Sequence, residues 1–154
     1  MPVVESSIQI AAPRAAVLAV ARDVEKFPEF MADVKSLTVN ERSPDGLRTV
    51  TEWVGIVPKF GAKVHWVEED VWDLEVGTCV FRQLTGDYDK FEGVWRFTVV
   101  DEATTRFDST LEFALEIPLV GGLIKQIILK TMQNNLDDTL AAIKQRAEAA
   151  SKSS

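Results

Sequence analysis

The sequence predicts an α+β domain in which a seven-stranded antiparallel sheet is covered by a long C-terminal helix. In residues 34–116 the hydrophobic period is two, and clusters of turn-forming residues divide this region into six β-rich runs. Strands joined by short turns form an antiparallel meander, and residues 4–10 add a first strand. After residue 122, apolar side chains recur every three or four positions, as on one face of a helix. These two periods, in this order, indicate the fold class.

Two short helices are expected between the first strand and the meander. Pro13 suits the first position of a helix, because the backbone donor that it lacks would be unpaired there. Residues 15–21 are rich in alanine and favour helix. Asp23 is of a type that caps helix N-termini, which predicts a second short helix after it. Three bulky residues follow on that helix: Phe27, Phe30 and Met31.

The last two runs of the meander alternate most clearly between apolar and polar residues. The expected inner residues are Phe91, Gly93, Trp95, Phe97 and Val99 in one run and Phe107, Ser109, Leu111, Phe113 and Leu115 in the other. The residues between them are mostly charged or threonine, so one face should be wet and the other covered. The apolar stripe of the C-terminal helix, about seven turns long, supplies the cover.

Composition indicates one domain and narrows the classes of partner. The chain has 154 residues, of which 46% are hydrophobic, so residues 1–150 form a single domain and residues 151–154 are expected to be a frayed tail. The net charge is −7, and residues 62–116 carry five basic and thirteen acidic side chains. Nucleic-acid phosphates attract basic patches, so no nucleic-acid partner is expected.

Few residues are available for conventional catalytic chemistry. Cys79 is the one cysteine and His65 the one histidine, which excludes a disulfide framework and a multi-histidine metal site. We therefore predict no metal and no cofactor. The N-terminus lacks a basic segment followed by a long apolar one, and the longest apolar stretch, near residues 117–124, is broken by proline and glycine. A cytoplasmic location without stable membrane insertion is expected, although transient membrane contact stays open.

Four segments resemble a known superfamily. They are IQIAAP at 8–13, DVEKFPEFM at 23–31, QLTGDYDKFEGVW at 83–95 and IPLVGGL at 117–123. With the order of elements, they resemble the START-related (SRPBCC) superfamily of helix-grip folds, which includes the birch-pollen-allergen-like group. Within it, the bacterial polyketide cyclase/dehydrase and coenzyme Q-binding branch is the most similar. The resemblance implies a curved sheet wrapped around the C-terminal helix, with an elongated apolar cavity between them.

The packing of a straight helix on a curved sheet also favours a cavity. A bent sheet and a straight helix touch along one line, so the space beside the helix must be filled by large side chains or by a ligand. Buried tryptophans need a partner for the indole N–H, which indicates a partly polar lining. The candidate ligand-binding residues are Phe27, Phe30, Met31, Trp53, Trp66, Phe81, Gln83, Phe91, Trp95, Phe97, Phe107, Ser109, Phe113, Ile124, Ile128, Met132, Asn135 and Leu136. Ordinary core packing is the alternative for each aromatic residue.

Candidate catalytic residues are few and weakly marked. His65 is the one group suited to acid–base work near neutrality, and Arg82 and Gln83 could polarise a carbonyl. The strand that contains His65 does not alternate cleanly, so its inner face is left open. Acidic residues at 68–70 are interpreted as a solvated edge. Adjacent strand residues point to opposite faces, so only Glu68 and Asp70 could act together.

Three functions remain, from different classes. The leading hypothesis is binding, and with it transport or sequestration, of a hydrophobic small molecule such as a lipid, an isoprenoid or quinone, or a polyketide-like compound. The alternative is a polyketide cyclase or dehydratase that folds its substrate in the same cavity. An interaction protein similar to a ribosome-association toxin is a third hypothesis, which the acidity of the sheet disfavours. The scarcity of histidine and cysteine favours a binding protein over an enzyme.

Overall fold

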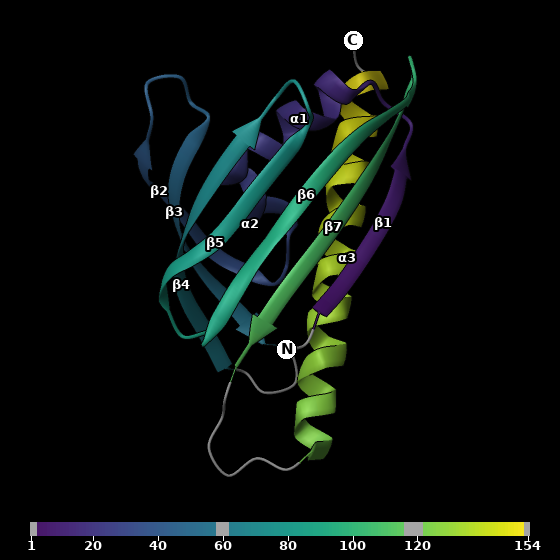
Figure 1. Ribbon diagram of the computed structural model, residues 1–154. Coiled ribbons are helices and arrows are strands. Elements are labelled where there is room, and N and C mark those ends of the chain that lie inside the picture. Colours follow the sequence, from purple (N-terminus) through teal and green to yellow (C-terminus); the bar gives the residue numbers. More distant parts are fainter. Residues whose placement is uncertain (1–2, 58–61, 116–121, 153–154) are drawn as a thin grey trace.

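The chain folds as one curved antiparallel sheet with helices on its inner side (Figure 1). The computed structural model describes residues 3–57, 62–115 and 122–152. The seven strands lie in the order β1-β7-β6-β5-β4-β3-β2, so the predicted fold class is confirmed. The strands are β1 (Val3–Ile10), β2 (Val34–Arg42), β3 (Arg48–Val57), β4 (Ala62–Asp73), β5 (Thr78–Gly86), β6 (Lys90–Asp101) and β7 (Thr104–Ala114).

Between β1 and β2 the chain forms α1 (Arg14–Arg22), a 3-10 turn η1 (Val24–Lys26) and α2 (Phe27–Phe30). Pro13 is the N-cap residue, one position before the predicted first helical position, and α1 begins at Arg14. The predicted capping role of Asp23 is wrong, because its side chain makes no capping hydrogen bond. The chain instead passes through η1, and Pro28 lies in the first turn of α2.

The long helix α3 (Gly122–Lys152) runs along one side of the sheet and not over its centre (Figure 1). It packs on β1 and on α1. At the seam between α3 and β1, polar side chains of the helix bind carbonyl groups of the strand. Gln133 Nε2 donates to the Glu5 carbonyl at 2.7 Å, and Lys144 Nζ donates to the Gln9 carbonyl at 2.7 Å. The helix continues to Lys152, so the first two residues of the expected tail at 151–154 are helical, and residues 153–154 lie outside the described residues.

The inner face of β6 and β7 carries the predicted aromatic core. Phe97 and Phe107 are almost fully buried, and their rings stack with centroids 4.4 Å apart. Phe113 and Leu111 are buried on the same face. Val99 departs from the prediction, since it is 53% exposed beside a bulge near the end of β6.

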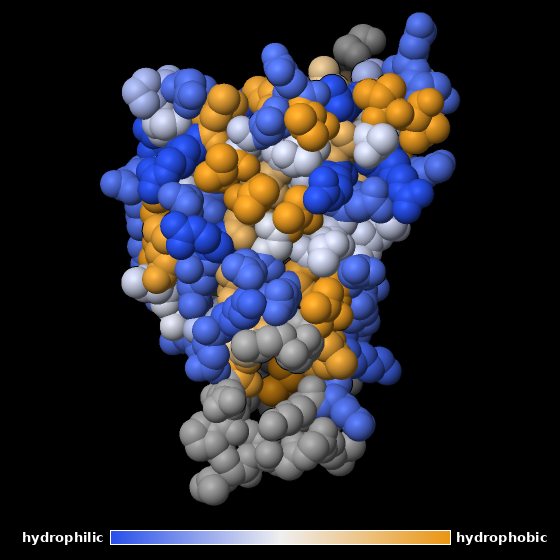
Figure 2. Space-filling model, viewed as in Figure 1, coloured by the Kyte–Doolittle hydropathy of each residue, from blue (hydrophilic) through white to orange (hydrophobic). Residues whose placement is uncertain are grey.

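The outer face of the sheet combines charged residues with groups of neighbouring apolar ones, as Figure 2 shows. Val71 and Val80 are cross-strand partners there, 44% and 50% exposed. Among the described residues, no helix is both long and apolar enough to span a membrane.

Phe107→Ala should destabilise the protein by about 3–5 kcal/mol, because it removes a fully buried ring and leaves a cavity against Phe97. Urea denaturation measures the free energy of unfolding. Val99→Ala, at an exposed position, is the control and should stay within about 0.5 kcal/mol of the wild type. Equal losses in the two variants would contradict this account of the core.

Candidate functional site

A cavity of about 880 Å³ lies between the inner face of the sheet and the three helices. It exists because α3 follows β1 and leaves space over β3, β4 and β5, which α1 and α2 reach through side chains such as Phe27, whose ring centroid lies 6.0 Å from that of Trp53. Its wall comes from α1, η1, α2 and α3 on one side and from strands β2 to β7 on the other.

All four tryptophans of the chain line this cavity. Trp53 and Trp66 are cross-strand partners, and their rings stack with centroids 5.5 Å apart. Each of these two indole N–H groups has a partner, as expected for a buried indole: Trp53 Nε1 donates to Thr51 Oγ1 and Trp66 Nε1 donates to Glu68 Oε1, both at 2.8 Å. The wall is therefore aromatic with a polar strip through it.

Eleven of the predicted ligand-binding residues line the cavity: Phe27, Phe30, Met31, Trp53, Trp66, Phe81, Phe91, Trp95, Met132, Asn135 and Leu136. They come from α2, α3 and strands β3 to β6, segments far apart in the sequence. A glycine helps to shape this wall. A Cβ on Gly93 would lie 2.6 Å from the Phe81 ring and would also meet the Thr110 carbonyl, so the missing side chain makes room for the ring.

The other predicted ligand-binding residues lie elsewhere. Four of them belong to the packed core beyond the cavity wall: Phe97, Phe107, Phe113 and Ile128. Ser109 is also buried there, and its hydroxyl has no hydrogen-bond partner among the described residues. Gln83 closes the turn between β5 and β6, where its Nε2 donates to the Tyr88 carbonyl at 2.8 Å. The side chain of Ile124 lies outside the described part of the structure.

The predicted catalytic role of His65 and Arg82 does not fit their positions. Both side chains are on the outer face of the sheet, about half exposed. His65 Nε2 lies 2.6 Å from Glu52 Oε2, and Arg82 pairs with Glu69 at 3.2 Å. Neither lines the cavity. Gln83 is absent from the wall as well, because the turn holds its amide.

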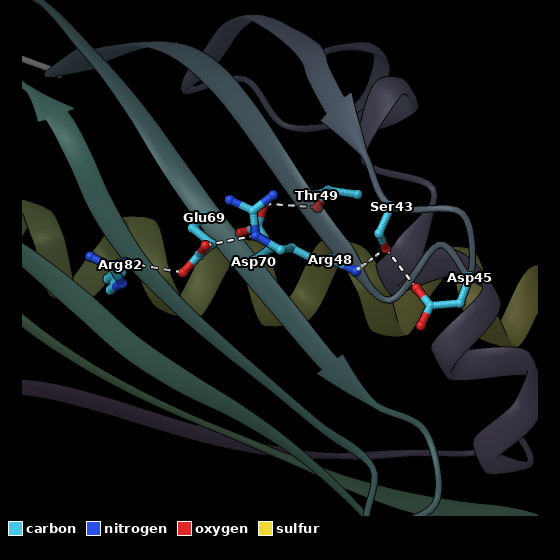
Figure 3. Close-up of polar contacts among 7 residues, drawn as sticks. All are labelled: Ser43, Asp45, Arg48, Thr49, Glu69, Asp70 and Arg82. Carbon is cyan, nitrogen blue, oxygen red and sulfur yellow. Dashed lines mark hydrogen bonds and ion pairs between the residues drawn. The ribbon is translucent and has the colours of Figure 1, made fainter.

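The interpretation of residues 68–70 as a solvated edge is wrong for two of the three. Glu68 and Asp70 are 5% and 7% exposed and line the cavity, between Trp66 and Trp72 on the inner face of β4. Glu69 alone points outward. Figure 3 shows it between Arg48 and Arg82, while Asp70 meets Thr49.

Neutral donors surround the carboxyl pair. Asp70 Oδ2 accepts hydrogen bonds from Thr49 Oγ1 at 3.1 Å and from Thr51 Oγ1 at 2.8 Å. A further side-chain hydrogen bond joins Asp70 to Glu68. Burial raises the pKa of Glu68 well above its ordinary value, and the neighbouring charge of Asp70 raises it further. Burial also raises the pKa of Asp70, against the lowering effect of its hydrogen bonds. We therefore assign the shared proton to Glu68.

Tyr88 adds a hydroxyl to the same wall. The side chain is 7% exposed, and its ring packs edge-on against Trp66 with centroids 5.6 Å apart. Its hydroxyl contacts Met132 Sδ at 3.8 Å, a weak acceptor. Burial raises the pKa of Tyr88, with smaller contributions from Asp87 and Glu68, so the phenol stays protonated. The cavity thus holds two protonated oxygen groups, on Glu68 and Tyr88.

Charged residues also occur elsewhere on the cavity wall. Arg22 and Arg42 belong to it, but each has a partner: Arg22 Nη2 donates to the Gly46 carbonyl at 3.1 Å and Arg42 pairs with Glu25 at 3.2 Å. Asp33 and Asp138 line it as well. Burial raises the pKa of Asp33, and the charge of Asp138 adds to the shift.

Comparison with known proteins shows the family to which this chain belongs. The family model described as polyketide cyclase/dehydrase and lipid transport matches residues 10–140. The chain belongs to this family. It is also 37% identical to a protein from Thermus thermophilus of known crystal structure, with a TM-score of 0.89 over 97% of this chain and 99% of that one. No curated protein matches.

More distant structures of the superfamily share the fold. The ZhuI aromatase/cyclase from Streptomyces sp. R1128 is 20% identical, with a TM-score of 0.79 over 95% of this chain and 93% of that one. A START superfamily protein from Mycobacterium smegmatis is 16% identical, with a TM-score of 0.81 over 97% and 99%. The predicted resemblance to START-related proteins is confirmed, and family membership supports hydrophobic ligand binding or a cyclase role in general.

Sequence reasoning missed the residues that give this family member its polar strip. Thr49, Thr51, Glu68 and Asp70 are absent from the predicted ligand-binding set. A signal was present, because Glu68 and Asp70 share their parity with Trp66 and Trp72 on one strand. In the described residues, no group of histidine, cysteine and carboxylate side chains is arranged to hold a metal. Cys79 is buried, and burial raises the pKa of its thiol.

Glu68→Gln should change how stability depends on pH. Folding raises the pKa of Glu68, so above about pH 4.5 the native state keeps a proton that the unfolded chain has released. The wild-type free energy of unfolding should therefore fall as pH rises from about 5 to about 8, and Glu68→Gln should reduce that fall. Urea denaturation across this range measures the slope.

Glu69→Gln is the matched control on the outer face. Arg48 holds the pKa of Glu69 below its ordinary value of 4.5, so the contribution of that carboxylate is already complete at about pH 5. Its variant should keep the wild-type slope across the same range. The same slope in wild type and Glu68→Gln would contradict a retained proton on Glu68.

Proposed function

We propose that this protein binds a hydrophobic small molecule, of lipid, isoprenoid, quinone or polyketide type, for transport or sequestration. The observation that carries the proposal is the cavity of about 880 Å³ between sheet and helices, which lies within the usual range for ligand pockets. Its wall is mainly aromatic and aliphatic, so most of the affinity would come from apolar burial, at roughly 25 cal/mol per Å² before ordering costs.

Packing supports a ligand over an empty space. Protein interiors are close-packed, and apolar voids cost stability in proportion to their volume. Nine aromatic side chains border this cavity and carry large apolar surfaces: Phe27, Phe30, Trp53, Trp66, Trp72, Phe81, Tyr88, Phe91 and Trp95. A hydrophobic occupant would bury these surfaces, which favours retention of a ligand during purification.

Leu136→Trp should block the cavity and lower ligand uptake by at least about tenfold, because Leu136 is 8% exposed and lines the wall from α3. Native mass spectrometry and organic extraction of purified protein detect a retained ligand. The four wild-type tryptophans report added quinones or long-chain alcohols by fluorescence, and calorimetry compares the variants.

Leu129→Trp is the control on the same helix, at a position 39% exposed, and should bind as the wild type does. The proposal fails if wild-type protein retains nothing and its fluorescence responds to none of the added compounds. It also fails if the two tryptophan variants bind equally well.

A second candidate function is a polyketide cyclase or dehydratase, which the two protonated groups in the cavity favour. A carboxylic acid at Glu68 and the phenol of Tyr88 could both donate hydrogen bonds to a substrate carbonyl and so polarise it for ring closure. These groups replace His65, Arg82 and Gln83, which lie outside the cavity wall.

Glu68→Gln with Tyr88→Phe should lower the rate of directed cyclisation of a linear poly-β-ketone by about 10²-fold or more, because both acidic O–H groups are lost and the amide at position 68 is not a proton acid. Chromatography of the products separates enzyme-directed rings from spontaneous ones. Glu69→Gln should retain wild-type products. A wild-type product pattern identical to the spontaneous one excludes this second function and leaves the binding function in place.

A further inference from the structure

We infer that the cavity selects a hydrophobic ligand whose polar end is a protonated amine, held between the Glu68–Asp70 pair, the Tyr88 hydroxyl and the surrounding aromatic rings. This inference rests on the proposed binding function and names the class of ligand. Three separate observations support it: a buried acid pair without a basic partner among the described residues, an aromatic cluster around it, and a buried phenol whose hydroxyl donates to a sulfur, a weak acceptor.

The acid pair lacks a counter-charge within the described part of the chain. The side-chain donors on Glu68 and Asp70, apart from the hydrogen bond between them, are two threonine hydroxyls and an indole N–H, all neutral. Neither carboxyl lies within ion-pair distance of a described lysine, arginine or histidine. A buried carboxylate is costly without an opposite charge, and an ammonium group of a ligand would supply one.

The aromatic residues beside the pair suit a cation. Trp66, Tyr88 and Phe91 form a tight cluster, with ring centroids 5.2 Å apart for Trp66 and Phe91 and 4.7 Å apart for Tyr88 and Phe91. Trp53 stacks on Trp66 and lines the same wall. Aromatic faces attract ammonium groups, and tryptophan does so most strongly.

The Tyr88 hydroxyl is an independent sign of a missing partner. The side chain is more than nine-tenths buried and lines the cavity, yet the contact that its hydroxyl makes among the described residues is the Met132 sulfur at 3.8 Å. Buried hydroxyls normally meet a nitrogen or oxygen partner. Trp66 contacts Tyr88 with its ring and Glu68 with its N–H, so the open phenol oxygen and the acid pair flank one indole. The phenol and the acid pair therefore both lie beside the Trp66 ring on the cavity wall.

The remaining charges of the wall disfavour an anionic ligand. Asp23, Asp33 and Asp138 add carboxylates to the lining, whereas Arg22 and Arg42 are engaged by the Gly46 carbonyl and by Glu25. A fatty-acid carboxylate would enter a cavity of its own sign, at a cost that low solvation increases.

A matched series of probes tests the inference: dodecylamine, dodecanol and dodecanoate, titrated below their micelle concentrations near neutral pH. Tryptophan fluorescence and calorimetry give the dissociation constants. We expect wild-type protein to bind dodecylamine at least about tenfold more tightly than dodecanoate, with dodecanol between them. In Asp70→Asn with Glu68→Gln, the amine and the carboxylate should bind within about threefold of each other.

Glu69→Gln is the control, since it removes the same type of charge from the same strand on the outer face and should keep the preference of the wild type. Asp70→Asn alone removes the charged member of the pair and serves if the double variant does not fold. It should reduce the preference while Glu69→Gln does not.

Each outcome of this series decides one point. If wild-type protein binds none of the three probes, the binding function itself fails. If it binds dodecanoate as tightly as dodecylamine, the binding function stands and the amine preference is overturned. A preference of wild-type size that persists without the acid pair, or that Glu69→Gln abolishes, also overturns the inference, because general surface charge would then explain it.

Discussion

The seam between α3 and β1 is the constraint on which the rest of the structure depends. Buried apolar residues of the helix, among them Leu140, Ile143 and Ala147, lie in the core, and side chains such as Gln133 and Lys144 bind carbonyls of β1. A helix fixed at that side cannot also cover β3 to β5. The sheet therefore curves around a space that α1, α2 and α3 enclose from the other side, and the cavity follows from where the helix is held.

The polar strip inside the cavity is built by register. Strands β3 and β4 pair so that Trp53 faces Trp66, Thr51 faces Glu68 and Thr49 faces Asp70. Both threonines of β3 donate to Asp70, whereas Glu68 accepts from the Trp66 indole of its own strand, and the strip ends in a stack of two indoles. Satisfied in this way, two carboxyl groups can remain buried within an aromatic wall, which an isolated acid could not.

Hydrophobic period predicted most of the architecture, because strands β6 and β7 and helix α3 each bury one clear face. It failed on β4, where the inner face carries two acids, Glu68 and Asp70, at positions that the period alone would give to apolar residues. His65 attracted attention as the one histidine, yet its strand parity places it outside. The residue type of His65 could not show which face of the sheet its side chain occupies. The pairing of β4 with its neighbours shows it. Gln83 shares the inner parity, but a local turn holds its amide.

The pairing of β1 with β7 also governs how the chain reaches this structure. Val3 lies opposite Glu112, and Ser6 bonds Asp137 across 131 positions of sequence. Both contacts join segments near the two ends of the chain, with the whole meander between them. Loop-closure entropy is lost before those contacts are gained, so the topology belongs to the slow-folding class dominated by non-local pairing. The enclosed space is consequently among the last features to form.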